Sequence, residues 1–457
     1  MSWFKKSLTA TGSVLFRGSL PPRAEEFEEQ FAKAGITVRP RPAPDDAHWR
    51  LRLEKPGWGK TDLVCPRQFA RVPTAVVAFD PRLTDDDRQA ATAAASGVTL
   101  TMQGGGRANV LADHKAFLRA LWLVMGADGV VALDHRSSKF WTRDMLDDEL
   151  AHDVDVDIEA LFTLHAVYDD RAAGAGGGGS AGDDDESEKR AYWLHSHGLA
   201  ELGFVDFDVL EPSADLIEAS SDATRAVAYA IAEGEIAAGA GPFELSHPGG
   251  DVQGVDAATF DRTADPKYAA LRDPDGHTDR RVVLCDPVGS GWLARLFGRT
   301  KPRPARWMSR PLGEQRVIHF PSSATQLMAE RARATYEYFR ALHAELAEFE
   351  LPALVKLGYE VDGGDADDRE HLWFEVHSLG DTTIDATLVN QPFRIARMQA
   401  GQRGEHPVER LTEWQIMTPL GAINPRESTA ARAIRSDRES FKQLFALAKA
   451  GLLPGMG

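Results

Sequence analysis

Cysteine is scarce in this chain of 457 residues, which contains only Cys65 and Cys285. The two thiols lie far apart in the sequence and neither belongs to a Cys-x-x-Cys pair. A disulfide scaffold and a thiolate zinc site of the usual spacing are therefore excluded. Two isolated thiols fit a reducing compartment, and we expect a cytoplasmic protein.

Long apolar runs are also lacking. No window approaches the roughly 18 uninterrupted apolar residues of a membrane-spanning helix, so no membrane association is expected. Residues 1–6 read Met-Ser-Trp-Phe-Lys-Lys and resemble the charged start of an export signal. The next residues are too polar and too few to form its apolar core. We therefore expect no export signal.

Positive charge is in deficit. The chain has 52 Lys and Arg against 69 Asp and Glu, a formal net charge of −17. This charge argues against nucleic acid as a general partner. A local exception is a basic stretch from Arg295 to Arg316, accompanied by two tryptophans, Trp292 just before it and Trp307 within it. Such a stretch can bind an anionic ligand, although a solvated loop docked on the chain's own acidic surface is the preferred interpretation.

Strand and helix patterns alternate along the chain, which predicts an α+β fold with mixed or antiparallel sheets and packed helices. We expect a large N-terminal region over residues 10–320, with a possible subdivision near 240–280. Residues 171–190 are rich in Gly, Asp and Glu and are expected to form a disordered loop inside one domain. A smaller C-terminal α+β domain is expected over 322–427, followed by a closing helix and tail over 428–457.

Several local patterns give more specific expectations. The uniformly apolar residues 75–79 predict a central strand, and the alternating acids of 152–157 predict a solvated edge strand. A single long helix is expected over 324–351. Trp373 and Trp414 lie in strand patterns and are expected to share one buried core.

The C-terminal third resembles a bacterial family called domain of unknown function 2314. The similarity is carried by Glu370-His371-Leu372-Trp373 and by Leu388-Val389-Asn390-Gln391-Pro392, whereas the matches at residues 399–401 and 413–414 each depart by one residue. It covers roughly residues 324–426. Upstream, residues 195–206 resemble the companion family, domain of unknown function 4026, over roughly 10–320. These resemblances imply an architecture and a bacterial protein, and they supply no activity and no catalytic residues.

The sharpest candidate site is the pair His195 and His197. Alternate residues of a strand point to the same face, so these two imidazoles can share one metal ion. Asp206, or Asp208 two residues later, can add a carboxylate ligand from the next strand. The ion would be zinc or another divalent metal. The alternative is that both histidines make ordinary hydrogen bonds at a strand end before a glycine turn, and this is the preferred interpretation, with no cofactor.

Three other motifs fail on their context. Residues 57–61 read Gly-Trp-Gly-Lys-Thr, but Glu54 occupies the position of the first glycine of a phosphate-binding loop. Residues 289–294 spell G-x-G-x-x-A without the helix that a dinucleotide site needs. Ser137 and Ser138 lie near His135 in sequence but lack the glycines of a nucleophile elbow.

No catalytic constellation stands out, so the catalytic residues stay unknown and an enzyme is the less favoured class. The preferred hypothesis is a non-enzymatic binding or regulatory module with an unidentified protein partner. One alternative is a metal-dependent hydrolase that uses His195 and His197. Another is an intracellular inhibitor of a protein partner, for which the net charge of −17 favours basic targets.

Overall fold

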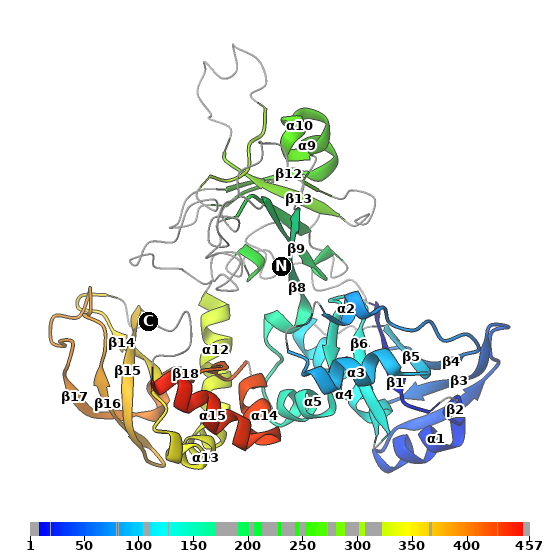
Figure 1. Ribbon diagram of the computed structural model, residues 1–457, viewed down its shortest axis with the longest axis horizontal. Coiled ribbons are helices and arrows are strands. Elements are labelled where there is room, and N and C mark those ends of the chain that lie inside the picture. The colour runs from blue at the N-terminus through cyan, green and yellow to red at the C-terminus, as the bar shows by residue number, and fades with distance from the viewer. Residues whose placement is uncertain are drawn as a thin grey trace. The chain divides into compact units, whose positions relative to one another are not determined.

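A computed structural model shows an α+β fold with two compact units (Figure 1). Unit 1 comprises Met1–Phe79, Ala93–Trp141 and Ile158–Ala324, and unit 2 comprises Asp80–Thr92, Thr142–Asp157 and Thr325–Gly457. The structure describes residues 9–18, 20–78, 80, 82–103, 110–126, 128–169, 191–200, 205–212, 227–229, 243–245, 252–269, 271–272, 280–287, 301–306, 322–364, 368–426 and 428–450. Within these ranges no helix has the length and apolarity that crossing a membrane requires.

The N-terminal part of unit 1 is built on a seven-stranded sheet, called sheet A, in the order β2-β3-β4-β5-β1-β6-β7. All its pairings are antiparallel. Its strands are β1 (Thr9–Phe16), β2 (Thr37–Arg41), β3 (Ala47–Glu54), β4 (Thr61–Pro66), β5 (Ser96–Gln103), β6 (Gly129–Asp134) and β7 (Lys139–Trp141).

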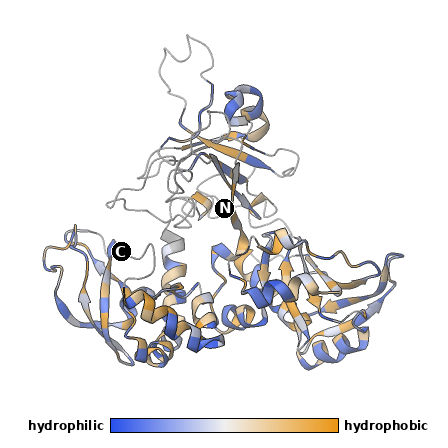
Figure 2. Cartoon of the chain, in the orientation of Figure 1, coloured by the Kyte–Doolittle hydropathy of each residue, from blue (hydrophilic) through white to orange (hydrophobic). Residues whose placement is uncertain are grey.

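The helices associated with sheet A follow from the sequence pattern. Helix α1 (Ala24–Lys33) buries Phe27 and Phe31, one turn apart, and begins with two glutamates that suit the positive end of its dipole. Helix α4 (Val110–Met125) is far more apolar and is buried along most of its length. In Figure 2 helix α1 is largely hydrophilic. The smaller helices are α2 (Thr74–Ala78) and the 3₁₀ turn η2 (Ile158–Leu161).

The rest of unit 1 contains sheet B, in the order β11-β12-β13-β10-β9-β8. The β10–β13 pair is parallel, and the β8–β9, β9–β10, β11–β12 and β12–β13 pairs are antiparallel. Trp193 of β9 packs in a small core with residues of α9 and β13, among them Phe260 and Cys285. The elements are β8 (Thr163–Asp169), β9 (Ala191–His197), β10 (Asp206–Leu210), β11 (Phe243–Leu245), β12 (Val252–Asp256), β13 (Arg281–Cys285), α9 (Ala257–Thr263) and α10 (Pro266–Ala269).

Unit 2 contains the antiparallel sheet C, in the order β17-β16-β15-β14-β18-β19. Its strands are β14 (Ala353–Glu360), β15 (Arg369–Leu379), β16 (Thr383–Leu388), β17 (Arg403–Pro407), β18 (Leu411–Thr418) and β19 (Gly421–Ile423). Its helices are α3 (Asp85–Ala93), α5 (Arg143–Leu150), α12 (Ser322–Ala334), α13 (Tyr336–Glu345), α14 (Thr429–Ser436) and α15 (Arg438–Lys449), with the 3₁₀ turns η6 (Ala347–Phe349) and η7 (Val408–Arg410).

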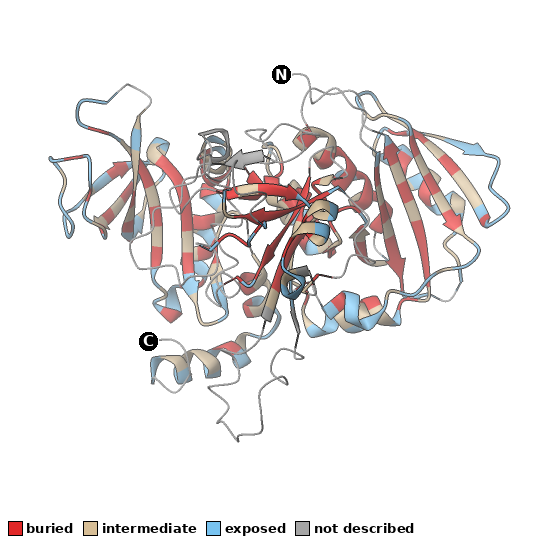
Figure 3. Cartoon of the chain, turned by 90° about the horizontal axis from the view of Figure 1, so that it is seen from above, coloured by how far each residue is buried: buried red, intermediate tan, exposed pale blue. Residues whose placement is uncertain are grey.

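Trp414 of β18 is the largest fully buried side chain of unit 2. Its ring stacks on Phe339 at a centroid distance of 4.8 Å, and its Nε1–H donates to Thr335 Oγ1 at 2.8 Å. Figure 3 shows the resulting pattern, with buried residues running along the strands of each sheet. Trp373 departs from expectation because it lies half-buried on the opposite face of sheet C, with Lys356 Nζ 4.9 Å from its ring centre.

Three local predictions are wrong. Residues 74–78 form helix α2 rather than a strand. Val76 is 38% exposed, whereas its neighbour Val77 is buried. Residues 152–157 form bends rather than an edge strand, and Asp157 is buried. The helix expected over 324–351 is interrupted at Thr335, which leaves the helical conformation where its hydroxyl accepts the Trp414 hydrogen bond.

Helix α5 belongs to unit 2, although the sequence pattern groups it with the N-terminal region. Glu149 of α5 accepts two hydrogen bonds from the Arg331 guanidinium, at 2.8 and 2.5 Å, and both side chains are nearly buried. Ser428 Oγ donates to Asp148 Oδ2 at 2.7 Å. Unit 2 is therefore assembled from segments that lie far apart in the chain.

Candidate metal centre

Strands β8 and β9 form an antiparallel pair on either side of residues 170–190, so this segment connects two neighbouring strands of one sheet. The segment itself, expected to be a disordered loop, lies outside the described residues. The register places His165 of β8 directly opposite His195 of β9. Residues directly opposite in an antiparallel pair share a face, and so do His195 and His197 on one strand. The pairing therefore gathers three histidines on one face of sheet B.

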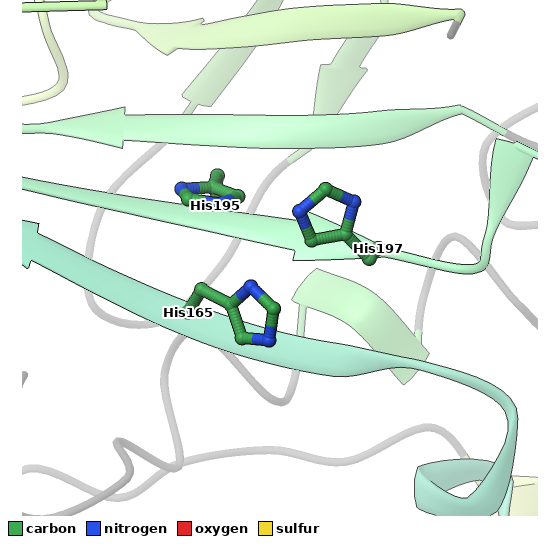
Figure 4. A group of neighbouring side chains, drawn as sticks. All are labelled: His165, His195 and His197. Carbon is green, nitrogen blue, oxygen red and sulfur yellow. The ribbon is translucent and has the colours of Figure 1, made fainter. Parts of the chain in front are cut away.

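The three imidazoles point toward one another (Figure 4). One nitrogen from each ring can be chosen so that all three lie within 4.8 Å of one another. The ring centroids of His165 are 5.4 Å from His195 and 4.9 Å from His197, and the last two are 4.8 Å apart. Zinc–nitrogen bonds of about 2.0 Å imply ligand nitrogens roughly 3.3 Å apart in a tetrahedral site. The observed limit of 4.8 Å is wider than this value, so binding one ion would draw the three rings closer together.

Burial differs among the three rings. His195 is only 3% exposed, whereas His165 and His197 are half-buried. The cluster therefore has a buried floor and an open side, so an ion can enter from solvent. In the part of the chain that the structure describes, this is the group of histidine, cysteine and carboxylate side chains with the spacing of a metal site.

Two neighbours fix the positions of the β9 histidines. The indole of Trp193, two residues before His195, lies 4.3 Å from that imidazole between ring centroids. Gly198 follows His197 with φ +114°, and a Cβ at this position would lie 2.4 Å from the Leu161 carbonyl oxygen. Only glycine fits both the conformation and the space. The His-Ser-His-Gly order therefore ends β9 at a tight turn packed against η2.

Asp206 was predicted as a carboxylate ligand, and the structure places it in a different role. Its Oδ1 accepts from Ser196 Oγ at 2.6 Å and from the Leu199 N–H at 3.3 Å, and its Oδ2 accepts from the Ala200 N–H at 3.0 Å. Asp206 thus holds the turn after β9. It is not in the group with metal-site spacing, where His165 takes the third place.

Asp208, the other carboxylate considered, lies directly opposite His195 on β10 and is fully buried. Its Oδ2 accepts from Arg272 Nε at 2.7 Å and its Oδ1 accepts from an Arg281 guanidinium nitrogen at 2.8 Å. Arg272 also contacts Asp261 of α9 at 2.6 Å. Both oxygens of Asp208 are therefore engaged with guanidinium groups.

A second buried polar group lies at the β6–β7 turn and shows why Ser137 is not a nucleophile. Ser137 is fully buried, and its hydroxyl donates to Asp134 Oδ2 at 2.8 Å. His114 contacts Arg136 through Nδ1 at 2.5 Å, and burial, reinforced by the Arg136 charge, lowers the pKa of His114 to about 3. His135 instead bonds Ser13 Oγ at 2.9 Å. These groups close the turn.

The remaining motifs add no site. Residues 57–60 lie between β3 and β4, and Thr61 begins β4. A strand rather than a helix therefore follows this segment, which does not fit a phosphate-binding loop. A shallow hollow of about 370 Å³ beside this turn is lined by Lys55, Trp58 and Lys60 among others. Residues 289–294, with Arg295 and Arg316 of the basic stretch, lie outside the described residues.

His165 is the member of the cluster that the sequence pattern did not predict. A signal was present, because Ser180 is the midpoint between His165 and His195 and lies at the end of the glycine run. A symmetric hairpin about that run would have paired the two histidines. Long loops leave strand register open, however, because the connection does not impose a turn type.

Comparison with known families supports the two resemblances. Residues 323–422 match the model of an uncharacterized protein conserved in bacteria (DUF2314). Residues 180–256 match the C-terminal model of a protein of unknown function (DUF4026), a shorter segment than 10–320, and they include His195 and His197. No curated protein and no solved structure matches the chain. A segment similar to the DUF4026 C-terminal model is thus followed by one similar to the DUF2314 model, which confirms the order of the two predicted resemblances.

Proposed function

We propose that this protein is a binding module whose histidine cluster, His165, His195 and His197, holds one divalent transition-metal ion. The observation that carries the proposal is the convergence of three imidazole nitrogens within 4.8 Å on one face of two paired strands. Imidazoles at this spacing are unfavourable neighbours once protonated, and a shared cation gives all three neutral rings a common partner.

The donor set supports a particular class of ion. Neutral imidazole suits zinc, copper, nickel and cobalt, whereas calcium and magnesium prefer oxygen ligands. The cluster offers three nitrogens, and the two carboxylates of the neighbouring strand β10, Asp206 and Asp208, are engaged elsewhere. Zinc is the preferred occupant because it is redox-inert and accepts tetrahedral sites with three histidines.

A second function, metal-dependent hydrolysis, has one specific observation in its favour. Three protein ligands leave a fourth coordination position open, which is the arrangement of catalytic rather than structural zinc sites. The binding role is preferred because the other titratable groups described near the cluster, Asp206 and Asp208, are committed to structural hydrogen bonds. Zinc-dependent turnover of an ester substrate by the parent chain, lost with His165→Ala, would favour the hydrolase instead.

The bacterial cytoplasm is the proposed setting. The family over residues 323–422 is described as conserved in bacteria. Cys65 and Cys285 are free and buried, and burial raises their pKa values to about 11 and 12. Both are therefore neutral, unreactive thiols at pH 7. Free thiols of this kind are typical of proteins in a reducing compartment.

Calorimetric titration of the metal-stripped chain with zinc tests the proposal. We expect one ion per chain for the parent, and binding at least about 100-fold weaker for His165→Ala and for His197→Ala, since each removes one of three ligands. His377→Ala is the matched control, because His377 is an exposed strand histidine on sheet C that bonds Thr387. Circular dichroism would verify that each variant is folded.

Equal zinc affinity for the parent, His165→Ala and His377→Ala would overturn the proposal. It would mean that any bound zinc lies outside the histidine cluster. His195 is avoided in this comparison because it is buried, so its replacement would mix loss of a ligand with loss of packing.

A further inference from the structure

We infer that the metal ion in the histidine cluster takes a small anion as its fourth ligand, so that the site is an anion-binding site. This inference rests on the proposed function and adds the chemical class of the ligand. It depends on the charge of the site and on which nearby carboxylates are already engaged.

The three protein ligands bring no negative charge. Metal-bound imidazole is neutral, so a divalent ion in the cluster keeps its full charge of two. His195, the floor of the site, is 3% exposed. A cation beside such a buried group is poorly hydrated on that side, and its charge needs a compensating anion.

The two carboxylates of β10, the strand next to β9, do not supply that compensation. Asp208 lies opposite His195, but it is held between the guanidinium groups of Arg272 and Arg281 at 2.7 and 2.8 Å. Arg272 also pairs with Asp261. The two carboxylates and the two guanidinium groups therefore have a net charge of zero. Asp206 is engaged by Ser196 and two backbone N–H groups.

Access for an anion comes from the half-buried side of the cluster. His165 and His197, on neighbouring strands, are both intermediate in burial, unlike the buried His195. An anion entering there meets the open coordination position directly. A neutral ligand such as water would bind in the same position but would leave the charge of the ion uncompensated, so an anion is favoured over it.

The test uses cobalt(II), whose visible absorption reports its coordination, and azide as the anion. Metal-stripped chain is loaded with cobalt in a buffer without coordinating anions and then titrated with azide. We expect a saturable change of the cobalt absorption band. His377→Ala should behave as the parent does, and His165→Ala should bind cobalt too weakly to give the band.

A charge-compensating variant makes the test specific. His165→Glu replaces a neutral ligand by a carboxylate at a half-exposed position, so cobalt binding is retained and the net charge of the site falls by one. We expect azide to bind about tenfold more weakly, or worse, because the attraction between unit charges at ligand distance is large in a partly buried site.

The outcomes separate the two claims. Absence of a cobalt band in the parent would overturn the metal-binding function and the anion inference together. A normal cobalt band that azide does not change, or equal azide affinity in the parent and His165→Glu, would overturn the anion inference alone. In that case the metal-binding function would stand.

Discussion

At the residue scale, the same side-chain type has unrelated roles in different surroundings. His165, His195 and His197 converge at an open edge of sheet B. His114, by contrast, lies inside unit 1 in contact with Arg136, where burial lowers its pKa to about 3. Residue type therefore identifies candidate ligands, and only burial and neighbours decide which of them can bind an ion.

His114 should make stability fall in acid. Between its ordinary pKa of 6.5 and its folded pKa of about 3, the unfolded chain binds a proton at this residue that the folded chain does not. The free energy of unfolding therefore decreases as the pH falls through this range, by about 1.4 kcal/mol per pH unit for this group. Urea unfolding of the parent and His114→Asn from pH 7 to pH 4 measures it.

The contribution of His114 is the part of the pH dependence that His114→Asn removes. The exposed His377→Asn serves as the control and should follow the parent. A His114→Asn profile parallel to that of the parent would contradict the assignment.

The two tryptophans of sheet C should differ strongly in their contribution to stability. Trp414 is fully buried, stacked on Phe339 and hydrogen-bonded to Thr335, so Trp414→Ala should cost about 3–5 kcal/mol. Trp373 is half-exposed, so Trp373→Ala should cost about 1–2 kcal/mol. Denaturant unfolding of both variants measures the difference, and losses of equal size would show that the two faces of sheet C are equally protected from solvent.

At the element scale, the turn after β9 links the fold to the candidate site. Gly198→Ala should lower the unfolding temperature and weaken zinc binding, because its Cβ would meet the Leu161 carbonyl oxygen at 2.4 Å beside His197. Gly421→Ala is the matched control, since Gly421 has the same φ of +114° with open space around it. Gly421→Ala should lower the free energy of unfolding only by the backbone strain of that conformation, about 1 kcal/mol. Differential scanning calorimetry and zinc titration give both readouts.

Equal effects of the two glycine substitutions would mean that close packing at Gly198 does not position the site. Backbone strain alone would then account for both.

Most elements follow from local patterns, and the exceptions have local causes. The amphipathic helix α1 and the alternating strand β3 are predicted within a few residues. Helix α2 is not, because a five-residue apolar run fits a strand or a helix equally well by periodicity. Pro73, whose carbonyl accepts from Val76 N–H at 3.0 Å, starts a helical turn there. At the break, the Thr335 hydroxyl donates to the Arg331 carbonyl of its own helix and accepts from Trp414, which lies 79 residues away.

The position of His165 beside His195 and His197 could not be predicted from the sequence for a similar reason. His195 and His197 are two positions apart, so strand periodicity alone places them together. His165 joins them only through the register of β8 and β9, which is a tertiary property. Asp206 follows β9 closely and was the natural candidate from sequence, but its hydrogen bonds to Ser196 and the following turn could not be read from spacing.

At the scale of the whole molecule, unit 2 combines the C-terminal third with Asp80–Thr92 and Thr142–Asp157. A linear division near residue 322 separates Arg331 from Glu149, its carboxylate partner on α5. An unpaired, buried guanidinium is strongly destabilising. The family match over residues 323–422 therefore covers only part of unit 2, which also includes Asp80–Thr92 and Thr142–Asp157.

Glu149→Gln in the full chain should lower the free energy of unfolding of unit 2 by about 3 kcal/mol, because the side chains of Arg331 and Glu149 are only 6% and 10% exposed. Glu26→Gln is the control, since its pair with Arg23 is largely exposed and should contribute less than about 1 kcal/mol. A fragment of residues 322–457 should likewise gain stability when a peptide of residues 142–157 is added. A fragment that unfolds identically with and without the peptide would contradict this account.

X-ray absorption at the zinc edge of the zinc-loaded full chain tests the central claim most directly. The account predicts one zinc with three imidazole nitrogens at about 2.0 Å and one further light-atom ligand, and loss of the imidazole scattering in His165→Ala. A first shell that contains sulfur, or one made of oxygen alone, would contradict the claim that His165, His195 and His197 form the metal site.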